Sequence, residues 1–221
     1  MIYLFCNENY GQPFLAAAKQ YIAYHPNTIR IVLSGKRHYP KNRLKKLIAK
    51  LKFLIRKKQR EVFLSYQHQI PVLVIENVNL PNFQKKIRSE DSGIVAGFNQ
   101  IFSPTTITRF NSLVNFHPSL LPFYRGPIPS YWCLKNNEKK TGYTLHRITP
   151  EIDAGEILFQ AAMEIGEIQN PDELDRAIAQ TAVPTFLNYL DHLRTGKPWS
   201  IQKLDATTFY SVLIDYASFP K

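Results

Sequence analysis

Two polar residues at the end of one apolar segment could do chemistry together. Asn115 and His117 lie two positions apart at the carboxyl end of a run beginning at Ser112, which is typical of a buried strand. Because side chains alternate across a strand, these two point to the same side of the sheet. In an open α/β sheet, ligands bind beyond the carboxyl ends of the strands. The sequence therefore predicts a pocket in which an amide donor and an imidazole face one ligand.

The residues around this pair resemble the signature of the folate-dependent formyltransferase family. Pro118 ends the strand, and Pro122 and Gly126 keep the following turn irregular. The resemblance extends over residues 71 to 165 and is carried by Leu113 to Gly126, Trp132, Thr141 to His146, Ile152 to Ile157 and Gln160. It implies transfer of a formyl group from 10-formyltetrahydrofolate to an amine, with no metal and no covalent intermediate on the enzyme.

The resemblance also implies roles for individual residues. Asp153 is expected to face Asn115 and His117 as the third catalytic residue, and the segment from Ala96 to Phe102 is expected to line the folate pocket. His146 matches a recurring family position, where we expect a histidine with a structural role. The folate-binding residues so implied are Phe98, Asn99, Gln100, Ile101, Phe102 and Ile152. Those expected to bind the acceptor substrate are Tyr10, Asn77, Ser119, Arg125 and Gly126.

The three catalytic residue types suit formyl transfer. An amine that attacks a formyl carbon generates an oxyanion and a positively charged nitrogen. Asn115 can donate a hydrogen bond to that oxyanion, as can a protonated His117, and each preorganised donor is commonly worth ~3 kcal/mol. Asp153 would favour the charged imidazole and position a water that relays the proton from the amine to the leaving nitrogen.

The order of the expected elements indicates the fold class. Strands at residues 2–6 and 29–33 flank a helix at 14–23, and this order predicts an α/β, Rossmann-like, mostly parallel sheet with helices on both faces. Further strands are expected at 72–75, 93–97 and 112–116, helices at 83–88 and 171–193, and a short antiparallel strand pair at 143–147 and 157–162. Gly11 stands alone after the first strand, which argues against an NAD fingerprint.

Length and composition indicate a single globular unit. The chain has 221 residues, 44% of them apolar, enough to bury a core without a disulfide or a metal. We expect a catalytic domain over residues 1–195 and a C-terminal tail over 196–221 that packs on the domain or in the interface of a homodimer. The two cysteines, Cys6 and Cys133, form no metal-binding cluster. With no recognisable signal peptide or membrane-spanning run, the expected location is cytoplasmic.

The positive charge of the chain is concentrated in residues 36–60. This segment holds twelve lysines and arginines and no acidic residue; without it the chain has 16 basic and 17 acidic residues, although the whole carries a net charge of +11. Apolar positions from Leu44 to Ile55 recur with helical spacing, which predicts a basic amphipathic helix. The plainer interpretation is an apolar stripe packed on the sheet. Contact with an anionic membrane, with RNA or with a phosphorylated substrate stays open.

The segments before and after the motif narrow the choice of acceptor amine. The segment from Arg125 to Trp132 looks closest to sugar formyltransferases, which implies a dTDP- or GDP-linked amino-deoxy sugar for surface polysaccharide, and no nucleic-acid partner. The residues after Gln160 are too few for the second domain of methionyl-tRNA formyltransferases. The turn after Cys6 lacks the Gly- and Ser-rich phosphate loop of the glycinamide ribonucleotide enzymes. Glycinamide ribonucleotide and aminoacyl acceptors remain alternatives, as does an RNA- or membrane-binding protein without activity.

Overall fold

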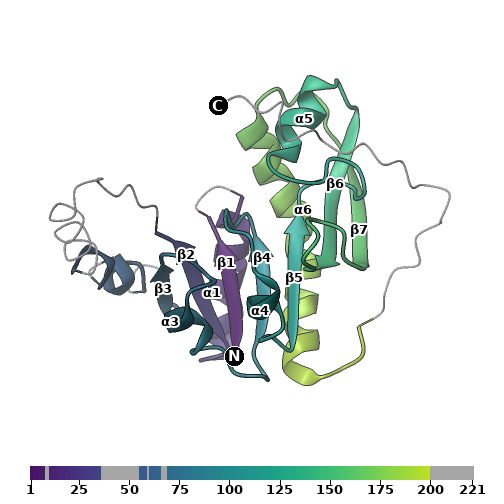
Figure 1. Cartoon of the computed structure of the whole chain (residues 1–221). Coiled ribbons are helices and arrows are strands. Elements are labelled where there is room, and N and C mark those ends of the chain that lie inside the picture. Colours follow the sequence, from purple (N-terminus) through teal and green to yellow (C-terminus); the bar gives the residue numbers. More distant parts are fainter. Residues whose placement is uncertain (8–9, 36–54, 59, 66–68, 200–221) are drawn as a thin grey trace, which may run out of the picture.

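A single mixed sheet forms the centre of the molecule (Figure 1). The computed structural model describes residues 1–7, 10–35, 55–58, 60–65 and 69–199. Its seven strands have the order β3-β2-β1-β4-β5-β6-β7. They are β1 (Ile2–Cys6), β2 (Ile29–Ser34), β3 (Val72–Ile75), β4 (Ser92–Ala96), β5 (Ser112–His117), β6 (Lys140–Arg147) and β7 (Ile157–Glu164). The first five are parallel, and β6 runs antiparallel to both β5 and β7. The predicted fold class is confirmed, with a second antiparallel pair added.

Helices cover both faces of this sheet (Figure 1). On one face lie α1 (Gln12–Tyr24) and the long α6 (Pro171–Thr195), whose side chains share one core cluster with those of β5 and β6. On the other face lie two one-turn helices, α3 (Pro81–Gln84) and α4 (Pro104–Ile107). A further short helix, α5 (Pro129–Lys135), precedes β6.

Aromatic side chains fill the core on each side of the sheet. The ring centroid of Phe14 in α1 lies 5.1 Å from that of Phe116 in β5 and 5.3 Å from that of Phe186 in α6. On the opposite face, the ring of Phe5 in β1 lies 5.1 Å from that of Phe102. All five residues of β1 are buried, as expected for a central parallel strand covered on both faces.

Element boundaries depend on capping residues that periodicity does not reveal. The helix expected at residues 83–88 instead begins at Pro81 and lasts one turn, because proline at the first helical position fixes φ and needs no N–H partner. In α6, the Asn170 side chain accepts hydrogen bonds from the N–H groups of Asp172 and Glu173, and Gly196 ends the helix at φ 69°. The tail beyond residue 199 lies outside the described residues. Within the described part of the chain, no helix is long and apolar enough to cross a membrane.

A helix of residues 55–58 and 60–65, here called the outer helix, lies beside the end strand β3 (Figure 1). Two of its side chains accept hydrogen bonds from backbone N–H groups of β3: Glu61 Oε1 from Val74 at 2.7 Å and Ser65 Oγ from Val72 at 2.9 Å. The outer helix thus covers an edge that could otherwise pair with another chain. The rest of the basic helix predicted over residues 36–60 lies outside the described residues.

We predict that Gly142→Ala weakens the pairing of β6 with β7. A Cβ atom at Gly142 would lie 2.0 Å from the Ala161 carbonyl oxygen, so the two strands would have to move apart. The free energy of unfolding should fall by about 1–3 kcal/mol, measured by urea denaturation. Ala162→Ser, at the exposed position paired with Gly142, should change it by no more than about 0.5 kcal/mol. Equal stability of the two variants would contradict this account.

Candidate active site

Strand β5 brings Asn115 and His117 to one side of the sheet, as their spacing predicts. In the antiparallel pair with β6, Asn115 lies opposite His146, and His117 lies opposite Thr144. His117 and His146 are buried, and their ring centroids are 6.3 Å apart. Each strand therefore contributes two polar side chains to the same place, close to the carboxyl end of β5.

Asp153 reaches this place from the loop between β6 and β7. Its Oδ2 lies 3.6 Å from His117 Nδ1, and its Oδ1 lies 3.6 Å from His146 Nε2. These are ion-pair distances, longer than a direct hydrogen bond. The backbone N–H of Gly126 donates to Oδ2 at 2.8 Å and fixes the carboxylate. The structure thus brings together all three residues that the resemblance implied as catalytic.

The hydrogen bonds of His146 define which of its nitrogens carries the proton. Nδ1 lies 2.9 Å from the Arg147 carbonyl oxygen, which can only accept, so Nδ1 is the donor. Nε2 is then free to accept from the Asn115 amide nitrogen at 3.1 Å. Burial lowers the pKa of His146 to about 4, although the Asp153 carboxylate offsets part of that shift. His146 is therefore neutral near pH 7 and orients Asn115, a positioning role that extends the structural role expected from the sequence.

His117 lies between two oxygen acceptors. Its Nε2 is 2.8 Å from the Tyr124 carbonyl oxygen, and its Nδ1 faces the Asp153 carboxylate. Because a carbonyl oxygen can only accept, Nε2 donates to Tyr124, while Nδ1 lies at ion-pair distance from Asp153. The expectation that His117 donates directly to an oxyanion differs from this arrangement, because both nitrogens already face protein oxygens. Asn115 uses one amide hydrogen on His146 and has a second for a ligand.

The loop after β5 is held by hydrogen bonds from β6 and β7. Thr144 Oγ1 donates to the Ser119 carbonyl at 2.6 Å, and Gln160 Nε2 donates to the Leu121 carbonyl at 2.6 Å. Ser119 itself is fully buried, and its hydroxyl donates to the Phe123 carbonyl at 2.7 Å. The prediction that Ser119 binds the acceptor substrate is therefore wrong: its hydroxyl shapes the turn that places the Tyr124 carbonyl against His117.

Arg125 and Gly126, also predicted to bind the acceptor, both hold the loop that carries Asp153. Arg125 Nε donates to the Ile152 carbonyl at 3.0 Å, and Nη2 contacts Glu151 Oε1 at 3.0 Å. Asp153 has φ 49°, a left-handed conformation that aspartate tolerates better than most residues. These contacts stabilise that backbone; direct substrate contact by Arg125 stays a prediction.

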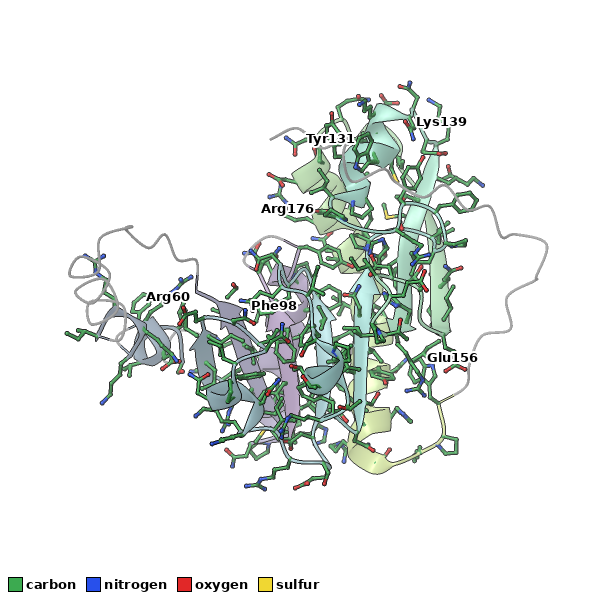
Figure 2. The ribbon with its side chains drawn as sticks, in the orientation of Figure 1. Arg60, Phe98, Tyr131, Lys139, Glu156 and Arg176 are labelled. Atoms are coloured by element: carbon green, nitrogen blue, oxygen red, sulfur yellow. The ribbon has the colours of Figure 1, made fainter. Side chains whose placement is uncertain are left out.

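The predicted folate-binding segment divides into inward and outward residues. Phe102 is buried and belongs to the core, and Gln100 is occupied with loop contacts, accepting from Val78 N at 2.9 Å and donating to Ser34 Oγ at 2.7 Å. Phe98, labelled in Figure 2, is half-buried and packs on Phe5. Asn99 and Ile101 are exposed, as is Ile152 next to Asp153. Phe102 is therefore a core residue, whereas folate binding by Asn99, Ile101 and Ile152 stays a prediction.

Two residues predicted to bind the acceptor, Tyr10 and Asn77, differ in solvent exposure. Tyr10 is 2% exposed and packs on Phe14, and burial raises the pKa of its hydroxyl well above the usual value. The prediction that Tyr10 binds the acceptor substrate is therefore not supported, because its ring lies in the core against Phe14. Asn77 is exposed, and its Oδ1 accepts from the Asn79 N–H at 2.8 Å. Among the described residues, no group of three histidine, cysteine or acidic side chains could hold a metal ion.

Sequence reasoning missed the part played by Thr144 and underestimated His146. Both lie on a buried strand, two positions apart, in the same alternation that singled out Asn115 and His117. A search for paired polar residues on every buried strand would have found them. The Tyr124 carbonyl leaves no such signal, because backbone atoms are common to every residue.

The sequence agrees with this geometry: the family profile for formyl transferase matches residues 16–190. The chain therefore belongs to the formyl transferase family. The methionyl-tRNA formyltransferase of Geobacter sulfurreducens is 32% identical over 154 residues, which is 68% of this chain and 49% of that protein. That of Thermotoga maritima is 30% identical over 133 residues, 59% of this chain and 42% of that protein. The chain thus spans about half the length of the curated relatives it matches.

Solved structures support the fold. Glycinamide ribonucleotide transformylase 1 from Symbiobacterium toebii has a TM-score of 0.62 at 18% identity, covering 89% of this chain and 88% of that one. A sugar N-formyltransferase from Shewanella sp. has a TM-score of 0.62 at 20% identity, covering 96% and 77%. A sugar 3N-formyl transferase solved in the presence of dTDP and 5-N-formyl-THF has a TM-score of 0.65 at 17% identity, covering 95% and 68%.

We predict that His146 makes stability depend on pH in mildly acidic solution. Its pKa of about 4 in the folded protein returns to about 6.5 on unfolding, so the unfolded chain binds the proton first as pH falls. The free energy of unfolding is therefore unaffected by the titration of His146 above about pH 6.5. It falls progressively towards pH 4, by on the order of 3 kcal/mol.

The measurement is urea denaturation between these pH values for the wild type, His146→Asn and His25→Asn. His146→Asn should flatten the pH dependence, whereas His25→Asn, at a histidine on the C-terminal boundary of α1, should leave it unchanged. The same slope in all three proteins would show that His146 is not the titrating group.

Proposed function

We propose that this chain transfers a formyl group from 10-formyltetrahydrofolate to the amino group of a nucleotide-linked (dTDP or GDP) amino-deoxy sugar, for surface polysaccharide biosynthesis. The observation that carries the reaction is the cluster of Asn115, His117 and Asp153 beside the carboxyl end of β5. It occurs in a chain of the formyl transferase family. Folate and a nucleotide sugar are the proposed small-molecule partners.

Each residue of the cluster has a defined task in this reaction. The free N–H of Asn115 donates to the formyl oxygen as negative charge develops there, and His146 keeps the amide in place. His117, as an imidazolium held by Tyr124 and Asp153, adds positive charge to a buried site, where charge acts more strongly than in water. The Asp153 carboxylate positions a water that relays the proton of the attacking amine to the leaving nitrogen of tetrahydrofolate, whose bond to the formyl carbon breaks once the new C–N bond has formed.

Exposed apolar residues in the segment after β4 and beside Asp153 suit the formyl donor. Ile152 is 37% exposed next to Asp153, and Ile101 is 70% exposed in the segment that follows β4. Flat apolar contact of this kind, with backbone groups nearby, suits a planar pterin that hydrogen-bonds along one edge. We assign the donor to these residues with Asn99 and the half-buried Phe98, and no longer to Phe102.

The sugar acceptor is supported by the segment between Gly126 and β6. In α5, the ammonium of Lys135 lies 4.7 Å from the ring of Trp132 and 5.8 Å from that of Tyr131. Such a basic and aromatic group suits the base and diphosphate of a nucleotide. Sugar formyltransferases are among the similar solved structures, one with dTDP.

An aminoacyl acceptor is the second candidate, because the relatives in sequence are methionyl-tRNA formyltransferases. Glycinamide ribonucleotide is the third, because its transformylases match this fold over most of both chains. The first measurement is therefore formyl transfer from 10-formyltetrahydrofolate, followed by absorbance, across dTDP- and GDP-amino sugars, glycinamide ribonucleotide and methionyl-tRNA. Turnover with an amino sugar alone supports the proposal. Turnover with either other acceptor keeps the reaction and replaces the substrate.

We predict that Asn115→Ala, His117→Ala and Asp153→Ala each lower kcat by at least roughly 100- to 1,000-fold, as measured for other preorganised donors. Thermal unfolding should confirm that each variant is folded. Asn111→Ala, at the exposed residue just before β5, is the matched control and should retain full turnover. A folded His117→Ala protein with near-normal turnover would refute the assignment.

A further inference from the structure

Among its described residues, the outer helix presents three of its four large apolar side chains to solvent. Ile55 is 57% exposed, and Val62 and Phe63 are each 64% exposed, all within residues 55–65. Single exposed apolar residues are common on protein surfaces, but three within three turns of one helix form a patch. We call Ile55, Val62 and Phe63 the apolar patch.

The reason for this orientation lies on the opposite side of the same helix. Glu61 and Ser65 point inward because they accept the backbone hydrogen bonds of β3, and Leu64 is buried beside them. The helix therefore places Glu61, Ser65 and a single apolar residue, Leu64, on its inward side and leaves its other described apolar residues outside, whereas an ordinary surface helix turns its apolar stripe inward. The expectation that the apolar stripe of residues 44–55 packs on the sheet is wrong for Ile55, its one described member.

Exposed basic residues flank the apolar patch. Arg56, Lys58 and Arg60 belong to the same helix, and Figure 2 shows Arg60 at the β3 end of the molecule. Positions 55, 58 and 62 share one side of a helix because they are three and four residues apart. The whole segment 36–60 contributes twelve positive charges and no negative ones. An apolar centre with a basic rim is complementary to a surface that is apolar within and anionic at its boundary.

We propose that the outer helix binds an anionic phospholipid membrane surface, lying in the plane of the interface. Ile55, Val62 and Phe63 would enter the boundary of the acyl chains, while Arg56, Lys58 and Arg60 contact headgroup phosphates. RNA fits less well, because it would attract the charges and could stack a base on Phe63 but gains nothing from the aliphatic Ile55 and Val62. The contact is peripheral.

This surface is separate from the candidate active site. The outer helix lies beside β3, at one end of the sheet, whereas the catalytic cluster lies between β5 and β6 near the other end (Figure 1). Membrane contact would therefore leave the site open to solutes. A failure of the membrane proposal would also leave the proposed reaction untouched, because binding and turnover are measured separately.

The test is flotation of the full chain with vesicles of phosphatidylcholine alone or mixed with phosphatidylglycerol. Binding should require phosphatidylglycerol and weaken with added salt. The triple variant Arg56→Gln, Lys58→Gln and Arg60→Gln should bind roughly 100-fold more weakly, because each basic residue near such a surface contributes a factor of about five. The triple variant Ile55→Ser, Val62→Ser and Phe63→Ser should bind at least roughly tenfold more weakly.

Matched controls distinguish binding through the apolar patch and its basic residues from the effect of exposed charge or exposed aromatic rings elsewhere on the protein. Lys19→Gln, Lys85→Gln and Lys86→Gln together remove the same charge from exposed positions elsewhere, and Tyr24→Ser removes an aromatic ring that is 83% exposed. Both controls should bind vesicles within about twofold of wild type. Thermal unfolding should show that every variant is folded.

Four results would overturn the proposal. One is no binding to phosphatidylglycerol vesicles, and another is equal loss of binding in patch and control variants. The third is tight, salt-dependent binding of RNA that survives Ile55→Ser, Val62→Ser and Phe63→Ser while vesicles are ignored. A dimer that this same variant dissociates, again without vesicle binding, would assign the patch to a second copy of the chain.

Discussion

One carboxylate shared by two buried histidines is the constraint on which the site depends. Asp153 lies 3.6 Å from both His117 and His146, whose rings are too close together for both to be charged at little cost. Burial lowers the pKa of His146, and the proximity of His117 lowers it further. His146 is therefore neutral and becomes a hydrogen-bond acceptor that fixes Asn115.

The antiparallel strand β6 makes this arrangement rigid. It places His146 opposite Asn115 and Thr144 opposite His117, so that each proposed catalytic residue of β5 has a polar neighbour across the pair. Thr144 then joins the loop after β5 through the Ser119 carbonyl and the Leu121 N–H. Because that loop also supplies the Tyr124 carbonyl and the Gly126 N–H, the contacts of His117 and Asp153 are set by the same strand.

The two ends of the sheet are stabilised by different contacts. At the β7 end, Gln160 reaches back to the loop after β5 and supports the site. At the β3 end, Glu61 and Ser65 satisfy the edge N–H groups, and this turns the apolar residues of the outer helix towards solvent. Covering a polar edge and exposing an apolar patch are thus consequences of one helix orientation.

Features that depend on local backbone geometry could be predicted from the sequence alone. The apolar run ending at His117 predicted a strand, and the two-residue spacing of Asn115 and His117 predicted a shared side, because both follow from backbone geometry alone. The β-α-β order predicted the parallel sheet for the same reason, since the chirality of such connections is nearly fixed. Recognition of the family added Asp153, which its own turn-forming surroundings would not have singled out.

Which side chains can contact a ligand, and which are held by packing or hydrogen bonds within the protein, depends on the tertiary structure. Tyr10, Ser119 and Phe102 have suitable chemistry for ligand contact, but packing draws Tyr10 and Phe102 into the core and turns the Ser119 hydroxyl onto the backbone. Conversely, His146 gained its place opposite Asn115, 31 residues away in the chain, from strand pairing. Burial and pairing depend on residues distant in sequence, so spacing along the chain could not reveal them.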